Sequence, residues 1–125
     1  MKVDKVHHVA ILVKDLEGAG KFFSDLFGIK FDGPRVIKEG GIRNMMSSEG
    51  IELVTPLTPE SSVAKTLEQR GEGMMLLSLQ VPNVAKATAD MKAKGVRQIG
   101  TMASGATLFH PKDLHGVLIE LTEAH

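Results

Sequence analysis

The run Val6-His7-His8-Val9-Ala10-Ile11-Leu12-Val13 has the β-branched, apolar composition of a strand, and a helical stretch follows it directly. A second strand-like run, at residues 74–81, is also followed by a helical stretch. The spacing between the two is repeated elsewhere: a distance of 68 residues separates Val13 from Val81, Asp15 from Asn83, and Glu52 from Glu120. One offset shared by landmarks so far apart predicts an internal duplication.

Each half of the duplication carries the signals of a helix and of four strands. The first helix is predicted to have Asp15 as its N-cap and to stop at Gly28; the second has Asn83 and Gly95 in these roles. The apolar positions assigned to the core face of the first helix are Leu16, Ala19, Phe22, Phe23, Leu26 and Phe27. Further β-prone segments lie at residues 29–31, 36–38, 42–46, 96–99 and 106–109, with Gly33-Pro34 among the turns between them.

The resulting prediction is an α+β fold made of two tandem βαβββ modules, residues 4–55 and 72–123, within one domain that spans residues 1–125. Between the modules, residues 56–71 are predicted to form a helical linker, with Thr58 as N-cap and Pro59 at the first helical position. A chain of 125 residues suits a single domain.

Composition excludes several classes of function. Fifteen basic and fifteen acidic residues give a net charge of zero, so no electrostatic footprint for nucleic acid or for an anionic membrane is present. The absence of cysteine excludes disulfides and thiolate chemistry. The apolar runs are strand-sized, and residues 1–5 have no signal-peptide core. A cytoplasmic location is therefore the default expectation.

Strand alternation then places four duplicated positions on one face of the predicted sheet. If Ile51, Leu53, Val117, Ile119 and Leu121 pack under the helices, Glu52 and Glu120 share the opposite face. The 68-residue offset pairs His8 with Leu76, so that one imidazole and two carboxylates would converge inside a cup if the halves form one curved sheet. This donor set suits a divalent cation. A lone Glu or His on a strand is more often a solvated or structural residue, and the repeat is what favours the functional interpretation.

The duplicated pattern resembles the vicinal oxygen chelate (glyoxalase/bleomycin-resistance/dioxygenase) superfamily, and within it the methylmalonyl-CoA epimerases. The resemblance lies in residues 8–17, 51–57, 70–73, 110–113 and 116–121, which together span most of the chain in the expected order. It implies a glyoxalase-like, cup-shaped mixed sheet with the helices outside, a homodimer, and a substrate that chelates a metal through adjacent oxygens. It further implies an isomerase of a 2-methyl-malonyl-type acyl-CoA that acts by proton abstraction and enolate stabilisation.

The resemblance also implies roles for particular residues. His8 and Glu120 would hold the metal, with Glu52 in or near the coordination sphere; Co, Mn, Fe, Zn and Ni all remain open as its identity. Glu39 falls where related epimerases place a catalytic carboxylate, and Glu52 is the second candidate for the base. Leu76, Ser78 and Gln80, which share the face of Glu52, and Lys112, which could meet an anionic group, are the candidate substrate-binding residues.

Two departures leave an alternative open. The second histidine of the family would fall at Leu76, which cannot bind a metal, and the loop at residues 102–107 looks short and uncharged. The alternative is a metal-free, ligand-binding member of the superfamily, comparable to its drug-sequestering relatives. Two other histidines are given no chemical role: His7 is expected to point away from the cup, and His110, before Pro111, to cap or pack a turn.

Overall fold

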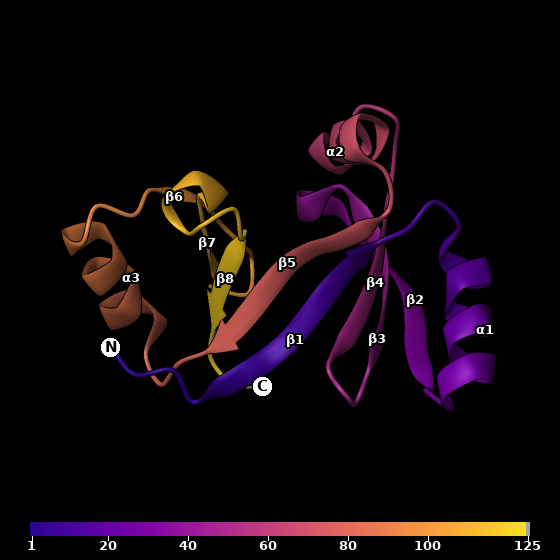
Figure 1. Cartoon of the computed structure of the whole chain (residues 1–125), viewed down its shortest axis with the longest axis horizontal. Helices are drawn as coiled ribbons and strands as arrows, with labels where there is room; N and C mark the ends of the chain where they lie inside the picture. The colour runs from indigo at the N-terminus through magenta and orange to yellow at the C-terminus, as the bar shows by residue number, and fades with distance from the viewer. Residues whose placement is uncertain (125) are drawn as a thin grey trace. The chain divides into compact units, whose positions relative to one another are not determined.

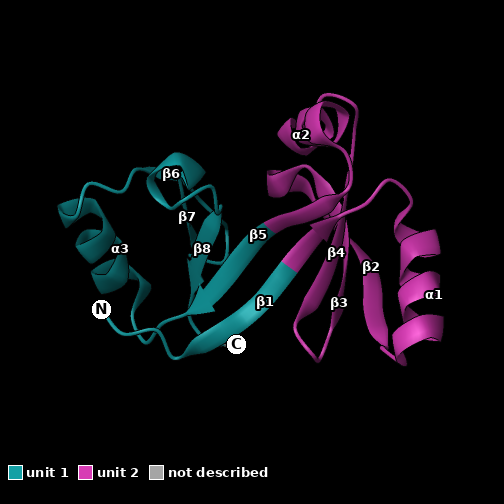
Figure 2. Cartoon of the chain, in the orientation of Figure 1, with its two compact units in different colours: residues 1–9, 76–125 teal, residues 10–75 magenta. Residues whose placement is uncertain are grey.

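The computed structural model describes residues 1–124, and their strands form a mixed sheet (Figure 1). The hydrogen-bonded order of the eight strands is β2-β3-β4-β1-β5-β8-β7-β6. The chain divides into two compact units, residues 1–9 with 76–125 and residues 10–75, and both β1 and β5 run from one unit into the other (Figure 2). The predicted α+β class and the βαβββ order of each half are confirmed. The module bounds 4–55 and 72–123 stay a prediction.

The unit of residues 10–75 contains the end of β1 (Lys5–Leu12) and the beginning of β5 (Gly73–Gln80). Between them come α1 (Leu16–Phe27), β2 (Phe31–Ile37), the 3-10 turn η1 (Lys38–Gly40), β3 (Ile42–Ser47), β4 (Ile51–Pro56) and α2 (Ser62–Arg70). Strands β2, β3 and β4 form an antiparallel meander.

Helix α1 begins and ends where the sequence predicts. The Asp15 carboxylate accepts a hydrogen bond from the Gly18 amide at 3.1 Å, and Gly28 ends the helix in the left-handed region at φ 69°. The core beneath α1 contains Val13, Leu16 and Leu53, with Ile51 packed against it. Ile51 and Leu53 therefore lie under the helix as predicted, and Glu52, between them, faces the other side of β4.

The predicted apolar face of α1 is too wide. Phe22, Leu26 and Phe27 are each about 60% exposed, whereas Leu16, Ala19 and Phe23 follow the i, i+3, i+7 stripe that meets the strands. Phe27, the last helical residue, stacks on Phe23 at the edge of that stripe. The prediction that Phe22, Leu26 and Phe27 belong to the core is wrong, because one helix on a sheet buries a single stripe.

Two further sequence predictions fail in this unit. The pieces expected at 29–31 and 36–38 are one strand, β2, in which a bulge between Asp32 and Arg35 accommodates Gly33-Pro34; β2 is an edge strand, where a proline is tolerated. Helix α2 starts at Ser62 rather than after Thr58. Residues 58–61 form a turn instead, and the Ser61 hydroxyl caps the helix by accepting from the Ala64 amide.

The other unit contains the beginning of β1 and the end of β5. Its remaining elements are α3 (Val84–Ala93), β6 (Gln98–Thr101), β7 (Thr107–Phe109), the 3-10 turn η2 (Pro111–Asp113) and β8 (Ile119–Thr122). Strand β5 is parallel to β8, whereas β6, β7 and β8 are antiparallel neighbours. Of the helices described in the two units, none is long and apolar enough to span a membrane.

The core of this unit lies between α3 and the strands. Asn83 caps α3 as predicted, and Gly95 follows the helix at φ 84°. The buried core residues are Val81, Val84, Ala87, Met91, Phe109 and Leu121, with Leu79 and Ile119 packed against them. Val117 is 40% exposed, because the chain turns through residues 111–117 and β8 begins only at Ile119. The prediction that Val117 lies under the helix is therefore wrong.

We expect Phe109→Ala to lower the free energy of unfolding by about 3–5 kcal/mol, since Phe109 is fully buried and its removal leaves a cavity. Phe22→Ala is the matched control, because Phe22 is 62% exposed, and its effect should stay within about 0.5 kcal/mol. Urea unfolding of both variants and of the wild type measures the difference. Equal losses in the two variants would contradict the assigned core.

A second prediction concerns pH. Hydrogen bonds from the Arg97 side chain and amide lower the pKa of Asp113 from 3.8 to about 2. Because the folded-state pKa is the lower one, the stabilisation is present above pH 3.8 and is lost as the pH falls through about 2. The stability gap between wild type and Asp113→Asn, measured in urea across this range, should close on acidification. A gap that stays constant down to pH 2 would contradict the assignment.

Candidate functional site

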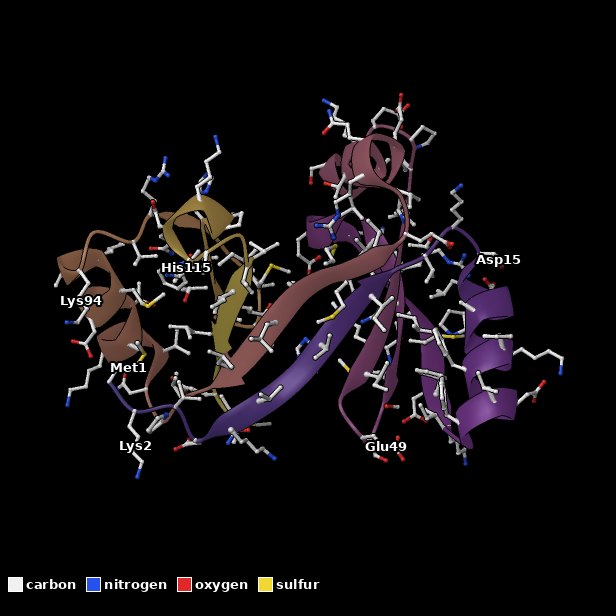
Figure 3. The ribbon with its side chains drawn as sticks, in the orientation of Figure 1. Met1, Lys2, Asp15, Glu49, Lys94 and His115 are labelled. Atoms are coloured by element: carbon white, nitrogen blue, oxygen red, sulfur yellow. The ribbon has the colours of Figure 1, made fainter. Side chains whose placement is uncertain are left out.

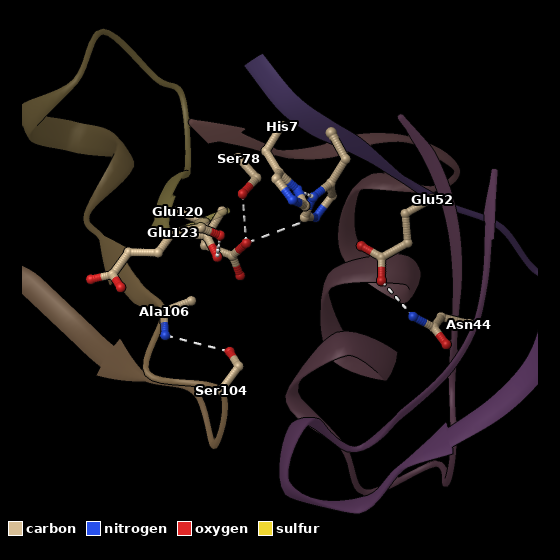
Figure 4. Close-up of polar contacts among 10 residues, drawn as sticks. His7, Asn44, Glu52, Ser78, Ser104, Ala106, Glu120 and Glu123 are labelled. Carbon is tan, nitrogen blue, oxygen red and sulfur yellow. Dashed lines mark hydrogen bonds and ion pairs between the residues drawn. The ribbon is translucent and has the colours of Figure 1, made fainter. Parts of the chain in front are cut away.

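Glu120 is the centre of a buried polar cluster in the unit that contains α3. Its neighbours Ile119 and Leu121 pack toward α3, so strand alternation turns the Glu120 side chain to the opposite face of β8. The parallel register of β5 and β8 places Ser78 directly beside it. The Ser78 hydroxyl, which is fully buried, donates a hydrogen bond of 2.7 Å to Oε1 of Glu120 (Figure 4).

His8 comes to the same carboxylate from β1. Its Nε2 lies 3.8 Å from Oε1 of Glu120, and both residues are less than a tenth exposed. The sequence predicts this pair as two metal ligands, and the structure brings them together. Ser78, predicted as a substrate-binding residue, lies here as a hydrogen-bond donor to Glu120.

His7 takes part in the cluster, contrary to the expectation from strand alternation. Its Nδ1 lies 2.7 Å from Nδ1 of His8, and the two rings meet edge to face with their centroids 5.0 Å apart. The prediction that His7 points away from the site is wrong. Adjacent side chains leave a strand on opposite sides, yet the two planar rings still turn toward each other.

The unit that contains α1 holds the second carboxylate, Glu52, on β4. Its Oε2 accepts a hydrogen bond of 2.7 Å from Nδ2 of Asn44 on β3, and both side chains are buried (Figure 4). In the antiparallel register Asn44 pairs with Val54, which places it diagonally across from Glu52 on the same face. Asn44 was not among the predicted site residues. The alternation of residues 42–47 could have indicated it.

The other predicted residues lie apart from these hydrogen bonds. Leu76 and Gln80 are half-buried, two residues to either side of Ser78 on β5. Lys112 is exposed on η2, and Glu39 is exposed on η1. Their substrate-binding and catalytic roles stay predictions. His110 caps η2, because its Nδ1 accepts a hydrogen bond from the Lys112 amide. Capping is one of the two roles expected for His110.

The fit to a divalent cation can be tested on the His8–Glu120 pair. Metal bonds to imidazole nitrogen and carboxylate oxygen are about 2.0–2.2 Å long, so one cation can contact two donor atoms that are 3.8 Å apart. The pair therefore fits as two ligands. Within residues 1–124, no group of three or more His, Asp or Glu could hold a metal ion. The predicted ligand set is divided between the two units, with Glu52 in one and His8 and Glu120 in the other.

Comparison with known proteins identifies the family of this chain. Residues 7–110 match the family model described as the Glyoxalase/Bleomycin resistance protein/Dioxygenase superfamily. The chain belongs to this superfamily. The resemblance to the vicinal oxygen chelate superfamily and the prediction of a glyoxalase-like fold are thereby confirmed.

Several relatives within the superfamily are epimerases. The chain is 32% identical to the mitochondrial methylmalonyl-CoA epimerase of Mus musculus, over 98% of this chain and 75% of that protein. It is 30% identical to the crystal structure of methylmalonyl-CoA epimerase from Mycobacterium tuberculosis, with a TM-score of 0.88 over 98% of this chain and 89% of that one. A variant of the Streptomyces coelicolor enzyme in complex with 2-nitronate-propionyl-CoA is 31% identical, with a TM-score of 0.88 over 99% and 100% of the two chains.

We predict that Ser78→Ala lowers the free energy of unfolding by about 1–3 kcal/mol, because it leaves a buried carboxylate oxygen without its hydroxyl donor. The matched control is Ser48→Ala, at an exposed serine in the turn between β3 and β4, which should change stability by less than about 0.5 kcal/mol. Denaturant unfolding at neutral pH measures both. A loss in Ser78→Ala no larger than in the control would contradict the assigned hydrogen bond.

Proposed function

We propose that this chain is a metal-dependent epimerase of a 2-methyl-malonyl-type acyl-CoA. The observation that carries the proposal is the buried His8–Glu120 pair, two metal-ligand side chains facing each other in a chain similar to methylmalonyl-CoA epimerases over nearly its whole length. An acyl-CoA ligand is supported by the relative that was crystallised with 2-nitronate-propionyl-CoA. The homodimer and the cytoplasmic location stay predictions.

Epimerisation removes the proton from the carbon between a thioester and a carboxylate and returns a proton to the other face of that carbon. The negative charge left behind is stabilised by spreading onto the thioester oxygen. A divalent cation (Co, Mn, Fe, Zn or Ni) held by His8 and Glu120 would supply the positive charge that stabilises this oxygen. Burial of both ligands strengthens their electrostatic interaction with a cation.

The proton itself requires carboxylates of this chain. Glu39 is the first candidate, because the resemblance implies a catalytic carboxylate there, and it is exposed on η1. Glu52 is the second candidate, provided that it does not ligate the metal, and Asn44 holds one of its oxygens in a buried, fixed orientation.

One observation favours a second candidate function. Leu76 stands at the position equivalent to His8, and the unit with α3 therefore presents two donors in its cluster rather than three. A protein that binds an apolar ligand without a metal would retain such a leucine. Two buried carboxylates with neutral hydrogen-bond donors fit this function less well than they fit a cation site.

The deciding experiment follows exchange of the α-proton of methylmalonyl-CoA in D₂O by mass spectrometry, after the stripped protein has been titrated with Co²⁺ and Mn²⁺. We expect exchange that tracks metal occupancy. Glu120→Gln should bind the metal more weakly and slow the exchange by roughly 10²-fold or more. The matched control is Glu49→Gln, at an exposed carboxylate in the turn between β3 and β4 (Figure 3).

The outcomes separate the two candidate functions. Metal binding with exchange, both lost in Glu120→Gln and kept in Glu49→Gln, supports the epimerase. Absence of exchange together with absence of metal binding up to roughly millimolar concentration overturns it. Binding of the acyl-CoA under those same conditions would then favour the metal-free binding protein.

A further inference from the structure

We infer that Ser78 is a positioning residue for Glu120: its hydroxyl holds Oε1 of the carboxylate in the orientation that faces His8. The sequence predicts Ser78 as a substrate-binding residue, so this is a different role for the same side chain. The inference rests on the proposed function in one respect, since Glu120 serves there as a cation ligand. Carboxylates that bind metals are themselves held by hydrogen bonds from a second layer of side chains.

The first observation is the burial of Ser78. Its side chain has no exposed surface, and a buried hydroxyl is costly unless it is hydrogen-bonded. The hydroxyl donates to Oε1 of Glu120 at 2.7 Å (Figure 4). A substrate could contact a fully buried hydroxyl only if the surrounding side chains moved, whereas the hydrogen bond to Glu120 is already made. The structure therefore favours a role of Ser78 through Glu120 over direct contact with a substrate.

The second observation is which oxygen of Glu120 the hydroxyl holds. Oε1 accepts the hydrogen bond from Ser78 and also lies 3.8 Å from Nε2 of His8. Each oxygen of a carboxylate has two lone pairs, so Oε1 can accept the hydroxyl with one and face a cation with the other. Ser78 therefore orients the oxygen that a cation between His8 and Glu120 would contact.

The third observation is the place of Ser78 in the sheet. Glu120 pairs with Ser78 on β5 and with Leu108 on β7. A leucine side chain has no hydrogen-bonding group, so of these two neighbours it is Ser78 that supplies a donor. The serine side chain is short, and the parallel register of β5 and β8 therefore sets the position of its hydroxyl.

The consequence is a preorganised ligand. A glutamate loses rotamer freedom when it binds a cation, and this loss opposes binding. The hydrogen bond from Ser78 restricts Glu120 before a cation arrives, so less freedom is left to lose. Removal of such a second-layer partner typically weakens metal binding by about 10–100-fold.

Three substitutions of Ser78 separate positioning from packing. Ser78→Ala removes the hydroxyl without adding volume. Ser78→Thr and Ser78→Val have the same shape as each other, and only the threonine keeps a hydroxyl. The matched control is Thr107→Val, which removes another buried hydroxyl of the same unit; it is hydrogen-bonded to Thr88 at 3.0 Å, and Thr107 pairs with Leu121 rather than with Glu120.

The first measurement needs no metal. Three-bond NMR couplings from the backbone nitrogen and carbonyl carbon of Glu120 to its Cγ show whether the side chain occupies one rotamer or averages over several. We expect one rotamer in the wild type, in Ser78→Thr and in Thr107→Val, and averaging in Ser78→Ala and Ser78→Val. The second measurement is titration with Co²⁺, in which the affinity should fall by about 10–100-fold in Ser78→Ala and Ser78→Val and stay close to that of the wild type in the other two variants.

Three results overturn the inference. Averaging over several rotamers of Glu120 in the wild type does so, even if Ser78→Ala and Ser78→Val do not fold. A single rotamer of Glu120 that persists in either of these variants, when folded, also does so. Equal losses of Co²⁺ affinity in Ser78→Thr and Ser78→Val would assign the effect to packing rather than to the hydroxyl.

Failure of the proposed function gives a different result. If the wild type binds no Co²⁺ while the rotamer of Glu120 still depends on the hydroxyl of Ser78, the positioning role stands and the metal-dependent epimerase falls. If the wild type binds Co²⁺ and exchanges the substrate proton while Ser78→Thr and Ser78→Val behave alike, the epimerase stands and the positioning role falls.

Discussion

The parallel pairing of β5 with β8 is the constraint on which the site around Glu120 depends. Ile119 and Leu121 must face α3 to complete the core of their unit, and Glu120 is thereby directed to the other face. The register then sets Ser78 beside it. A slip of one residue would expose the apolar pair and bury the carboxylate among aliphatic side chains, so the packing of the core also holds the chemistry in place.

The two units meet the same physical demand with different residues. A buried carboxylate is costly unless hydrogen bonds stabilise it. Glu120 receives a hydroxyl donor from its parallel neighbour β5, and Glu52 receives an amide donor from its antiparallel neighbour β3. In both cases the donor comes from the neighbouring strand, so the pairing of the strands determines which side chain meets the buried carboxylate.

The sequence predicts the parts of this fold that depend on local periodicity. The caps Asp15 and Asn83, and the inward faces of β4 and β8, follow from residues near one another in the chain. The sequence-based predictions are wrong where tertiary packing decides which residues are buried and where a helix begins. Whether Phe22 is buried depends on how much of α1 the strands cover, and residues 58–61 turn before α2 because Ser61 provides the cap.

In the candidate site, too, some features follow from local sequence patterns and others depend on tertiary packing. His8, Glu52 and Glu120 are predicted as site residues because the duplication and the strand period place them on one face, and the resemblance implies their roles. The contacts that Asn44 and Ser78 make depend on which strands are neighbours and in what register, which no local pattern contains. His7 was misjudged because alternation describes where a side chain leaves the backbone, not where a long side chain ends.

Leu76 changes what a cation site in this chain requires. With His8 and Glu120 as the two donors of their unit, a bound cation would retain more positions for water and for substrate oxygens than one with a further histidine. A substrate that chelates through two oxygens would then supply a larger share of the coordination. Because coupling between two ligands is reciprocal, the affinity for the cation should rise in the presence of the substrate as much as the affinity for the substrate rises with the cation.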